Sequence, residues 1–399
     1  MYNFFCRQLG GIFGAVANRL KARRSPVTVH DFVQGNLGNC GMVAAMAGLA
    51  KDKELRGKVA PWAEQGCRAG LPPKVAFNLF KMGEAHTVEV DRKLPTFKNK
   101  LVYCRSSNGN LLGPLLEKAL VQLHFGGNYE LSYGIHPGLV MASLTNNLCE
   151  DFRSLTSDSS VDFEELLSHG WKTNSQMVAT FWNPPPCNLI FSHCYSLIAE
   201  KNSEVTLYDP HGKIVKIQKD LFIDSNIMFE VSYPENKIFR MPDVKTRVDL
   251  TGNWSPLKGH VKMHFVEYDL LVEEDGTEIL INVNCRHVCS RVYGIKARIF
   301  IITNCMAVVK SSVFKHENRI SHAKSLRDNL MKGKYKIVVA LSKYNRRVSC
   351  AESREYLEEG GREFLLRVAA SKHCSVNEPA KKETGNIFNT LFDFLHFVI

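Results

Sequence analysis

Apolar and polar residues alternate along the C-terminal part of the chain, and short polar turns separate the alternating runs. This pattern begins at about residue 236 and predicts an antiparallel β-sandwich. The expected strands are YDLLVEED, TEILINVN, ARIFIIT, YKIVVAL and EFLLRVAA, and Glu274-Asp275-Gly276 is a typical turn between two of them. The last stretch, NIFNTLFDFLHFVI, carries apolar residues at helical spacing. It predicts a short amphipathic helix docked on the body of the protein.

The part ahead of the sandwich combines helical and strand-like patterns. A small-residue run that begins at Cys40 predicts a helix with Asn39 as its N-cap. Residues 160–170 predict a short helix that ends at Gly170. Three strands follow, QMVATF, LIFSHCYSLI and EVTLYD. The acidic and serine-rich residues 150–160 predict a surface connection between a mostly helical half and a β-rich half.

Cys40 is the first candidate for a catalytic residue. In the first turn of a helix its sulfur lies near unpaired backbone N–H groups and the positive end of the helix dipole, which stabilise a thiolate. The thiolate is the nucleophilic form of cysteine. Gln34, on the approach loop, can donate a side-chain N–H to an oxyanion that forms beside this sulfur. A buried cysteine in an Ala-rich core helix is the simpler interpretation of this segment taken alone.

Partner residues further along the chain favour the catalytic interpretation. A hairpin folded about the polar turn at residues 200–203 would place His193 opposite Asp209 or Pro210. An imidazole beside a carboxylate is the base and orienter of a Cys-His-Asp arrangement. His193 would take the proton of Cys40, and Asp209 would fix the tautomer of His193.

The segments with these residues resemble those of a known family. QGNLGNC, SHCYSL and YDPHG resemble, in order and spacing, the catalytic segments of the calpains, which are papain-like cysteine proteases. The segments VEVDRKLPT (88–96) and GPLLEKALVQLHFGGNYELS (113–132) resemble a strand and a helix of the same catalytic core. LTGNWSPLKGH (250–260), KGKYKIVVAL (332–341) and GGREFLLRVAAS (360–371) resemble the β-sandwich that follows it. The resemblance covers about residues 28–372.

The resemblance implies an α+β protein with a papain-like, two-lobed cysteine protease core and an antiparallel β-sandwich behind it. The expected domains are a basic leader at 1–27, a helical cysteine lobe at 28–150, a β-rich histidine lobe at 151–235, a calpain-type C2-like sandwich at 236–372 and a tail at 373–399. No EF-hand loop is visible in the sequence.

The implied function is that of an intracellular cysteine endopeptidase that hydrolyses protein substrates. The resemblance assigns Cys40 as nucleophile, His193 as base, Asp209 as orienter and Gln34 as oxyanion donor. Two other classes stay open. One is a catalytically impaired, protease-like binding or regulatory protein, and the other is an adaptor at a membrane surface.

Three residues at the site depart from the family pattern. Gly41 stands where calpains carry tryptophan, which predicts the loss of a large wall of the cleft. Asp209 replaces asparagine, and a carboxylate orients the histidine equally well while stabilising its charged form more strongly. His211 replaces the tryptophan that shields this hydrogen bond, so we expect a wetter and weaker pair.

No cofactor or metal is expected, although the resemblance implies calcium. The stretch 133–147 holds no Asp or Glu, and 209–219 is basic after Asp209. Calcium needs several oxygen ligands, usually carboxylates, so we expect weak or no calcium dependence. Cysteine and histidine are also close together at 187–194 and 285–289, but neither spacing matches a common zinc pattern.

Composition supports an intracellular protein with more than one domain. The chain has 399 residues and twelve cysteines without the regular spacing of a disulfide framework, which predicts free thiols in a reducing, cytoplasmic setting. No apolar run approaches the ~20 residues of a membrane-spanning helix. The net charge of +11 is not accompanied by a nucleic-acid-binding motif, so no nucleic acid is expected as a partner.

The leader is basic and partly apolar. Residues 1–30 contain five Lys or Arg residues that lie within 7–24 and no acidic residue before Asp31. An amphipathic helix of this kind can contact an acidic membrane surface or act as an organellar address. A short helix packed on the protease core is the alternative, and we favour it.

Overall fold

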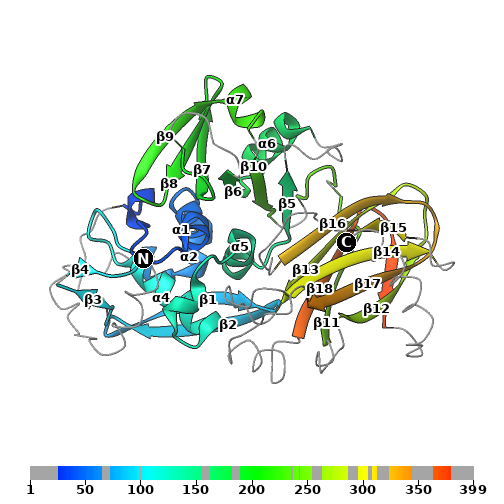
Figure 1. Ribbon diagram of the computed structural model, residues 1–399, viewed down its shortest axis with the longest axis horizontal. Coiled ribbons are helices and arrows are strands. Elements are labelled where there is room, and N and C mark those ends of the chain that lie inside the picture. Colours follow the sequence, from blue (N-terminus) through cyan, green and yellow to red (C-terminus); the bar gives the residue numbers. More distant parts are fainter. Residues whose placement is uncertain are drawn as a thin grey trace. The chain divides into compact units, whose positions relative to one another are not determined.

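The computed structural model divides the chain into two compact units (Figure 1). The described residues up to 234 belong to the first unit, and those from 237 onward belong to the second. The described residues are 26–64, 72–98, 100–153, 162–181, 189–225, 227–234, 237–241, 243–253, 263–285, 295–303, 308–311, 323–343 and 363–378. The leader up to residue 25 and the expected C-terminal helix lie outside them.

The first unit begins with helices and a hairpin. The helices are α1 (Cys40–Ala47), α2 (Lys53–Val59), α3 (Pro61–Glu64), α4 (Leu112–Phe125) and α5 (Pro137–Thr145), with short 3-10 turns η2 (Val29–Asp31), η3 (Gly48–Ala50) and η4 (Tyr129–Ser132). The strands are β1 (Lys74–Lys81), β2 (Glu84–Asp91), β3 (Thr96–Phe97) and β4 (Lys100–Leu101). β1 and β2 form an antiparallel hairpin because KVAFNLFK buries alternate residues and Met82 and Gly83 supply a turn with positive φ.

Helix α1 lies at the centre of the first unit (Figure 1). It packs against α4 and α5 on one side and against strands of the following sheet, β6, β7 and β8, on the other. Every residue from Gly41 to Ala47 is buried, which the small side chains of this helix allow. Val178, Cys194 and Tyr208 of the sheet belong to the same apolar core as α1, α4 and α5. The helical half and the β-rich half therefore share one core.

The second half of this unit is an antiparallel sheet in the order β5-β10-β6-β7-β8-β9. Its elements are β5 (Cys149–Arg153), α6 (Phe163–Lys172), β6 (Gln176–Phe181), β7 (Cys194–Lys201), β8 (Glu204–Asp209), β9 (Lys213–Gln218), α7 (Lys219–Ile223) and β10 (Ile227–Ser232). Strands β6 and β8 have the predicted bounds.

The hairpin of β7 and β8 differs from the predicted one. β7 starts at Cys194, so residues 189–193 form a loop ahead of the strand rather than its first part. Asn202 and Ser203, both with positive φ, make a tight two-residue turn in place of the expected four-residue one. A register irregularity lies further along β7. Ser196 consequently pairs with Tyr208, one position from the expected register.

Two other boundaries were predicted wrongly. Residues 149–153 are strand β5, which pairs with β10, so the expected surface connection does not begin at residue 150. Helix α6 continues through Gly170 to Lys172. A Cβ at Gly170 would lie 2.3 Å from the sulfur of Met177, so this glycine permits close packing instead of ending the helix. The left-handed residue after the helix is Asn174.

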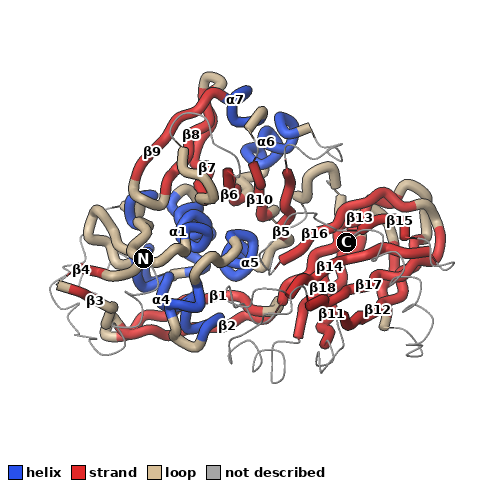
Figure 2. The backbone as a smooth tube through the Cα atoms, viewed as in Figure 1, coloured by secondary structure: helices blue, strands red, loops and turns tan. Residues whose placement is uncertain are grey.

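The described part of the second unit is built of strands (Figure 2). They are β11 (Thr246–Asn253), β12 (Met263–Val272), β13 (Thr277–Cys285), β14 (Ile295–Thr303), β15 (Val308–Ser311), β16 (Ala323–Leu330), β17 (Gly333–Lys343), β18 (Glu363–Ala370) and β19 (Cys374–Asn377). They form two antiparallel sheets in the orders β11-β18-β13-β16 and β15-β14-β17-β12-β19. The predicted turn at 274–276 carries the chain from β12 in one sheet to β13 in the other.

The predicted α+β architecture is confirmed, with one correction at the end of the sandwich. β19 pairs with β12, so the sheet extends to Asn377 and the tail does not begin at residue 373. Cys374 and Val376 are buried, which explains why this short segment joins the sheet. No helix among the described residues has the length and apolar character needed to span a membrane.

Gly41 has no space for a side chain. A Cβ at this position would lie 2.3 Å from the carbonyl oxygen of Ile135 and 3.0 Å from the ring of Pro137. The segment leading into α5 thus lies directly against the backbone at the position where the resemblance implies tryptophan. The absence of a side chain at Gly41 therefore leaves no empty space at this position, because neighbouring backbone occupies it.

Gly41→Ala is expected to lower the free energy of unfolding by about 1–3 kcal/mol, because the added methyl group collides with backbone that cannot move independently. Urea unfolding followed by circular dichroism measures this change. Gly48→Ala is the matched control, since a Cβ there first meets the end of the Gln176 side chain at 3.2 Å. Equal effects of the two substitutions would contradict the packing argument.

Candidate active site

The loop ahead of Cys40 is held by backbone hydrogen bonds. Val33 and Arg105 exchange two bonds of 2.8 Å, and the N–H of Asn36 donates to Val102 at 2.9 Å. Gly35 must be glycine here, since a Cβ would lie 2.3 Å from the carbonyl oxygens of residues 102 and 103. The approach loop is thereby fixed to the neighbouring chain and delivers Cys40 as the first residue of α1, where it is half-buried.

Asn39 occupies the predicted N-cap position, but its side chain does not cap the helix. Its amide nitrogen donates instead to the Glu117 carboxylate at 2.7 Å. Glu117 also accepts from the backbone N–H of Cys104 at 2.8 Å, and burial raises the pKa of Glu117 to about 7. This buried carboxyl group, which we had not predicted, anchors the residue next to Cys40. The sequence signal for it is an acidic residue inside an otherwise apolar helix.

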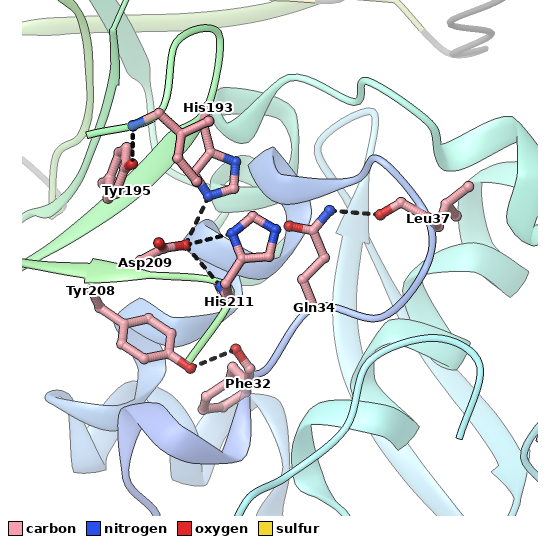
Figure 3. A network of polar contacts seen from close by, with 9 residues as sticks. Phe32, Gln34, Leu37, His193, Tyr195, Tyr208, Asp209 and His211 are labelled. Atoms are coloured by element: carbon pink, nitrogen blue, oxygen red, sulfur yellow. Dashed lines mark hydrogen bonds and ion pairs between the residues drawn. The ribbon is translucent and has the colours of Figure 1, made fainter. Parts of the chain in front are cut away.

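His193 and Asp209 meet as predicted. The Nε2 atom of His193 lies 2.9 Å from Oδ1 of Asp209, and the two side chains are only 7% and 6% exposed (Figure 3). Because Nε2 is used by the carboxylate, Nδ1 is the nitrogen that remains for a thiol or a substrate. The structure therefore brings together the predicted imidazole and carboxylate although the strand register differs.

The loop at 189–193 sets the position of His193. The hydroxyl of Tyr195 accepts from the N–H of Ile190 at 2.7 Å, and the N–H of Ser192 donates to Phe181 at 2.7 Å. Ser192 has a φ of 53°, a conformation that is uncommon for a residue with a side chain. The ring of Tyr195 meets that of His193 edge to face at 5.0 Å. Tyr195 is thus a supporting residue that the sequence pattern did not reveal.

His211 covers the pair, contrary to the expectation of a wetter site. Its ring stacks on His193 with centroids 4.6 Å apart and planes 15° apart. Its Nδ1 lies 3.0 Å from Oδ1 of Asp209, and its backbone N–H donates to the same oxygen at 2.8 Å (Figure 3). A planar imidazole can shield the hydrogen bond by stacking, and it contacts the carboxylate through a nitrogen as well.

The electrostatics of the site favour a charged cysteine–histidine pair. The pKa of Cys40 lies well below its usual value. A hydrogen bond from the Cys194 thiol is the first cause, and the hydrogen bond and charge of His193 lower this pKa further, whereas burial of Cys40 raises it. Burial also opposes the charged form of His193, but hydrogen bonds with Asp209 and Cys40 raise the pKa of this histidine to about 9. Hydrogen bonds from His193 and from the N–H of His211 outweigh burial and keep the pKa of Asp209 below its usual value.

Gln34 connects the cysteine loop to the turn that carries Asp209. Its backbone N–H donates to the carbonyl oxygen of Pro210 at 2.7 Å, and its side-chain amide donates to Leu37 at 2.6 Å (Figure 3). The hydroxyl of Tyr208 adds a bond of 3.0 Å to Phe32 in the same loop. These contacts tie the two halves of the site together, and one donor of the Gln34 amide is used inside its own loop.

One group of side chains among the described residues has metal-ligand geometry. His193, Asp209 and His211 place their ligand atoms within 4.8 Å of one another. Both imidazoles are directed at the same carboxylate oxygen, so the atoms that would bind a metal already hold the pair together. The arrangement is that of an oriented base, and we assign no metal to it.

Comparison with known proteins agrees with this geometry. The family model described as calpain family cysteine protease matches residues 17–219, which include Gln34, Cys40, His193 and Asp209. The chain belongs to the calpain family. The match covers the helical half of the first unit and most of the sheet that carries His193 and Asp209.

Individual calpains resemble parts of this chain. Calpain-5 of Mus musculus is 34% identical over 142 residues, covering 34% of this chain and 22% of calpain-5. Calpain-12 of Mus musculus is 38% identical over 121 residues, covering 30% and 16% of the two chains. Calpain-A of Drosophila melanogaster is 29% identical over 196 residues, covering 47% and 23%. The chain therefore spans 16–23% of the length of these relatives.

A solved structure of the clostridial cysteine protease Cwp84 aligns over 86% of this chain and 96% of its own. The identity is 12% and the TM-score is 0.23, which is too low a similarity to support an inference about this calpain-family chain.

Replacing Asp209 by Asn should lower the pKa of His193 from about 9 toward the usual value of roughly 6.5, because the amide oxygen accepts a hydrogen bond but carries no charge. The imidazolium then loses its proton at lower pH, so the Cys40 thiolate has a cationic partner over a narrower range. The rate of Cys40 alkylation by iodoacetamide, measured against pH by mass spectrometry, should therefore fall at pH 7–8.

Asp220→Asn is the control for this measurement, since it removes the same charge from an exposed position on α7. Its alkylation profile should match that of the unmodified chain. A profile for Asp209→Asn that also matched would show that Asp209 is a turn residue without influence on the pair.

Proposed function

We propose that this calpain-family chain is a cysteine endopeptidase that hydrolyses peptide bonds. One observation carries the proposal, namely the buried His193 ring held by the Asp209 carboxylate at 2.9 Å. The lowered pKa of Cys40 and the raised pKa of His193 favour a thiolate beside an imidazolium. This is the reactive state of a papain-type nucleophile.

The reaction follows from this arrangement. The Cys40 thiolate attacks the scissile carbonyl carbon and forms a tetrahedral intermediate. The His193 imidazolium donates its Nδ1 proton to the departing amine, which leaves a thioester on Cys40. Neutral His193 then takes a proton from water, and the hydroxide formed attacks the thioester and releases the acid. Asp209 keeps the ring oriented and stabilises its charged form in both steps.

The oxyanion of each intermediate needs hydrogen-bond donors. The backbone N–H of Cys40 lies at the start of α1, where the first N–H groups of a helix lack helical partners. The Gln34 amide has two N–H donors and uses one on Leu37, so we assign the second to the oxyanion. The anchoring of Asn39 by Glu117 holds the first of these donors in place.

The substrates we propose are proteins or peptides with apolar side chains near the cleaved bond. Ile190 and Phe191 are 44% and 57% exposed and belong to the loop that positions His193. Exposed apolar side chains close in sequence to the catalytic base can contact apolar groups of a bound chain. A peptide library cleaved without any preference for apolar residues would contradict this assignment.

We also propose that the chain acts in a reducing, intracellular compartment. No disulfide bond involves Cys40, Cys104, Cys149, Cys194 or Cys374, and the proposed reaction needs a free thiol. Recovery of the chain only from a secreted or organellar fraction of cells would be inconsistent with this proposal.

Cys40→Ser should abolish cleavage of a denatured protein substrate, with a loss of at least about a thousandfold, because a hydroxyl is far harder to deprotonate here than a thiol. Far-ultraviolet circular dichroism should show an unchanged fold. Cys374→Ser, which removes a thiol from the second unit, is the matched control and should retain activity. A folded but wholly inactive unmodified chain would favour the alternative, a protease-like binding or regulatory protein.

The described residues of the stretches in question do not fit the calcium that the family resemblance implies. Helix α5 is apolar and buried from Pro137 to Leu144. Asp209 accepts from two histidines, and β9 adds lysines rather than carboxylates. Of the acidic residues further along, Glu150 accepts from Tyr233, and Asp162 caps α6. These carboxylates are already used by partners within the fold.

Contacts within the chain support an alignment of the two halves without calcium. The two halves are connected by the hydrogen bond between Tyr208 and Phe32, by that between Gln34 and Pro210, and by the packing of α1 on β7. We therefore propose that activity depends weakly or not at all on calcium.

Cleavage of a fluorogenic peptide by the purified chain should be unchanged between excess calcium and excess chelator, and isothermal calorimetry should detect no micromolar calcium binding. Micromolar binding together with activity that appears only when calcium is added would refute this reading of the site.

A further inference from the structure

A buried carboxylate lies where strand β10 meets helix α5. Glu230 is in the middle of β10, and its side chain is only 2% exposed. Asp151 of β5 and Val178 of β6 pair with it in the sheet. A carboxylate in such a place needs partners, because its removal from water is costly. The proposed catalytic steps do not use Glu230, so its partners indicate what it does.

Two partners of this carboxylate come from residues 134–138, which we call the entry segment of α5. The backbone N–H of Gly138 donates to Oε2 of Glu230, and Nδ1 of His136 lies 3.0 Å from Oε1. His136 is the N-cap residue of α5, but its side chain does not cap the helix. The carboxylate from the sheet therefore satisfies one of the N–H groups that a helix leaves open at its start. A Cβ at Gly138 would lie 3.0 Å from Oε2, so glycine permits this close approach.

The entry segment also lies against the residues on both sides of the nucleophile. The N–H of Gly134 donates to the carbonyl oxygen of Gly38 at 2.8 Å. The carbonyl oxygen of Ile135 lies only 2.3 Å from where a Cβ of Gly41 would be. Helix α5 packs against both α1 and β10 (Figure 1). The entry segment thus connects Glu230 to the start of α1.

This connection reaches the oxyanion site. Gly41 directly follows Cys40, whose backbone N–H is an assigned oxyanion donor. Because Gly41 has no side chain that could adapt, a shift of the entry segment passes directly to the first turn of α1. Misplacement of a reacting group by about 1 Å can cost roughly a hundredfold in rate. The position of the entry segment therefore matters for the rate of the proposed reaction.

We propose that Glu230 is a positioning residue for the peptidase reaction at Cys40. Its carboxylate holds the entry segment on the sheet, and the segment in turn holds the first turn of α1. The effect on catalysis rests on the proposed function, whereas the effect on the position of α1 does not. At Gly41 this chain has backbone packing where the family resemblance implies a tryptophan side chain, so the start of α1 depends on an anchor for that backbone.

The test compares kinetic constants for a fluorogenic peptide between the purified full chain and its variants. In Glu230→Ala the kcat should fall by about tenfold to a hundredfold, because the oxyanion donor moves. The KM should stay within about twofold, since this donor acts on the transition state rather than on bound substrate. Glu230→Gln should keep most of the kcat, because its amide oxygen can accept from Gly138 and its amide nitrogen can donate to His136.

Glu150→Ala is the matched control. Glu150 is a second buried carboxylate of this sheet, on β5, and it accepts from the hydroxyl of Tyr233 at 3.0 Å. Loss of a buried hydrogen-bond acceptor lowers stability in both variants, so circular dichroism first establishes a temperature at which both are folded. At that temperature Glu150→Ala should have the kcat of the unmodified chain. Equal losses of kcat in the two Ala variants would overturn the proposal, because general destabilisation would then explain both.

Gly138→Ala decides the question if Glu230→Ala does not fold. Alanine favours a helix more than glycine does, so α5 itself should not be weakened, but the added Cβ presses on Oε2 of Glu230. The kcat should fall with little change in KM. An unchanged kcat would show that the contact between the carboxylate and the entry segment has no influence on catalysis, and it would overturn the proposal.

Amide hydrogen exchange separates this proposal from the proposed function, because it needs no activity. In Glu230→Ala the peptide that covers residues 39–43 should exchange faster than in Glu150→Ala. In a chain without peptidase activity, faster exchange supports Glu230 as the anchor of α1 while the protease is removed, and equal exchange overturns both. In an active chain, an unchanged kcat in Glu230→Ala overturns the positioning role and leaves the protease in place.

Discussion

The burial of helix α1 is the constraint on which the site depends. Its residues after Cys40 pack against α4 and α5 on one side and against the sheet on the other. Small side chains and the bare backbone at Gly41 allow this close approach. Because the helix is held from both sides, its first residue stays at the junction of the two halves. The packing of this helix therefore sets the position of the nucleophile relative to the sheet.

A single carboxylate oxygen organises the other side of the junction. Oδ1 of Asp209 accepts from the ring of His193 and contacts both the ring and the backbone N–H of His211. Burial makes each of these contacts stronger than it would be in water. The carboxylate holds the imidazole in one orientation and supports its positive charge, and the stacked His211 ring takes the place that the resemblance implies for an indole. The site retains a shielded histidine while departing from the residues of its family.

The surroundings of the Cys40 sulfur combine contacts of two kinds. The hydrogen bond of the Cys194 thiol and the hydrogen bond and charge of His193 all lower the pKa of Cys40. The family resemblance implies the histidine and does not by itself imply a second thiol. Whether a cysteine at position 194 contacts the nucleophile depends on how β7 lies against α1, because neighbouring residues in a sequence can point to opposite faces.

The sequence by itself determined the residue types of the site and the nature of both units. The small-residue helix after Cys40, the strands at 176–181 and 204–209, and the alternating strands of the sandwich follow from local patterns that act over a few residues. Tertiary structure decided what local patterns do not contain. The pairing of Asn39 with Glu117 and the stacking of His211 on His193 join residues that lie apart in the sequence. The start of β7 at Cys194 and the inclusion of β19 in a sheet were settled in the same way, because strand ends are set by the partners a strand finds and not by its own sequence.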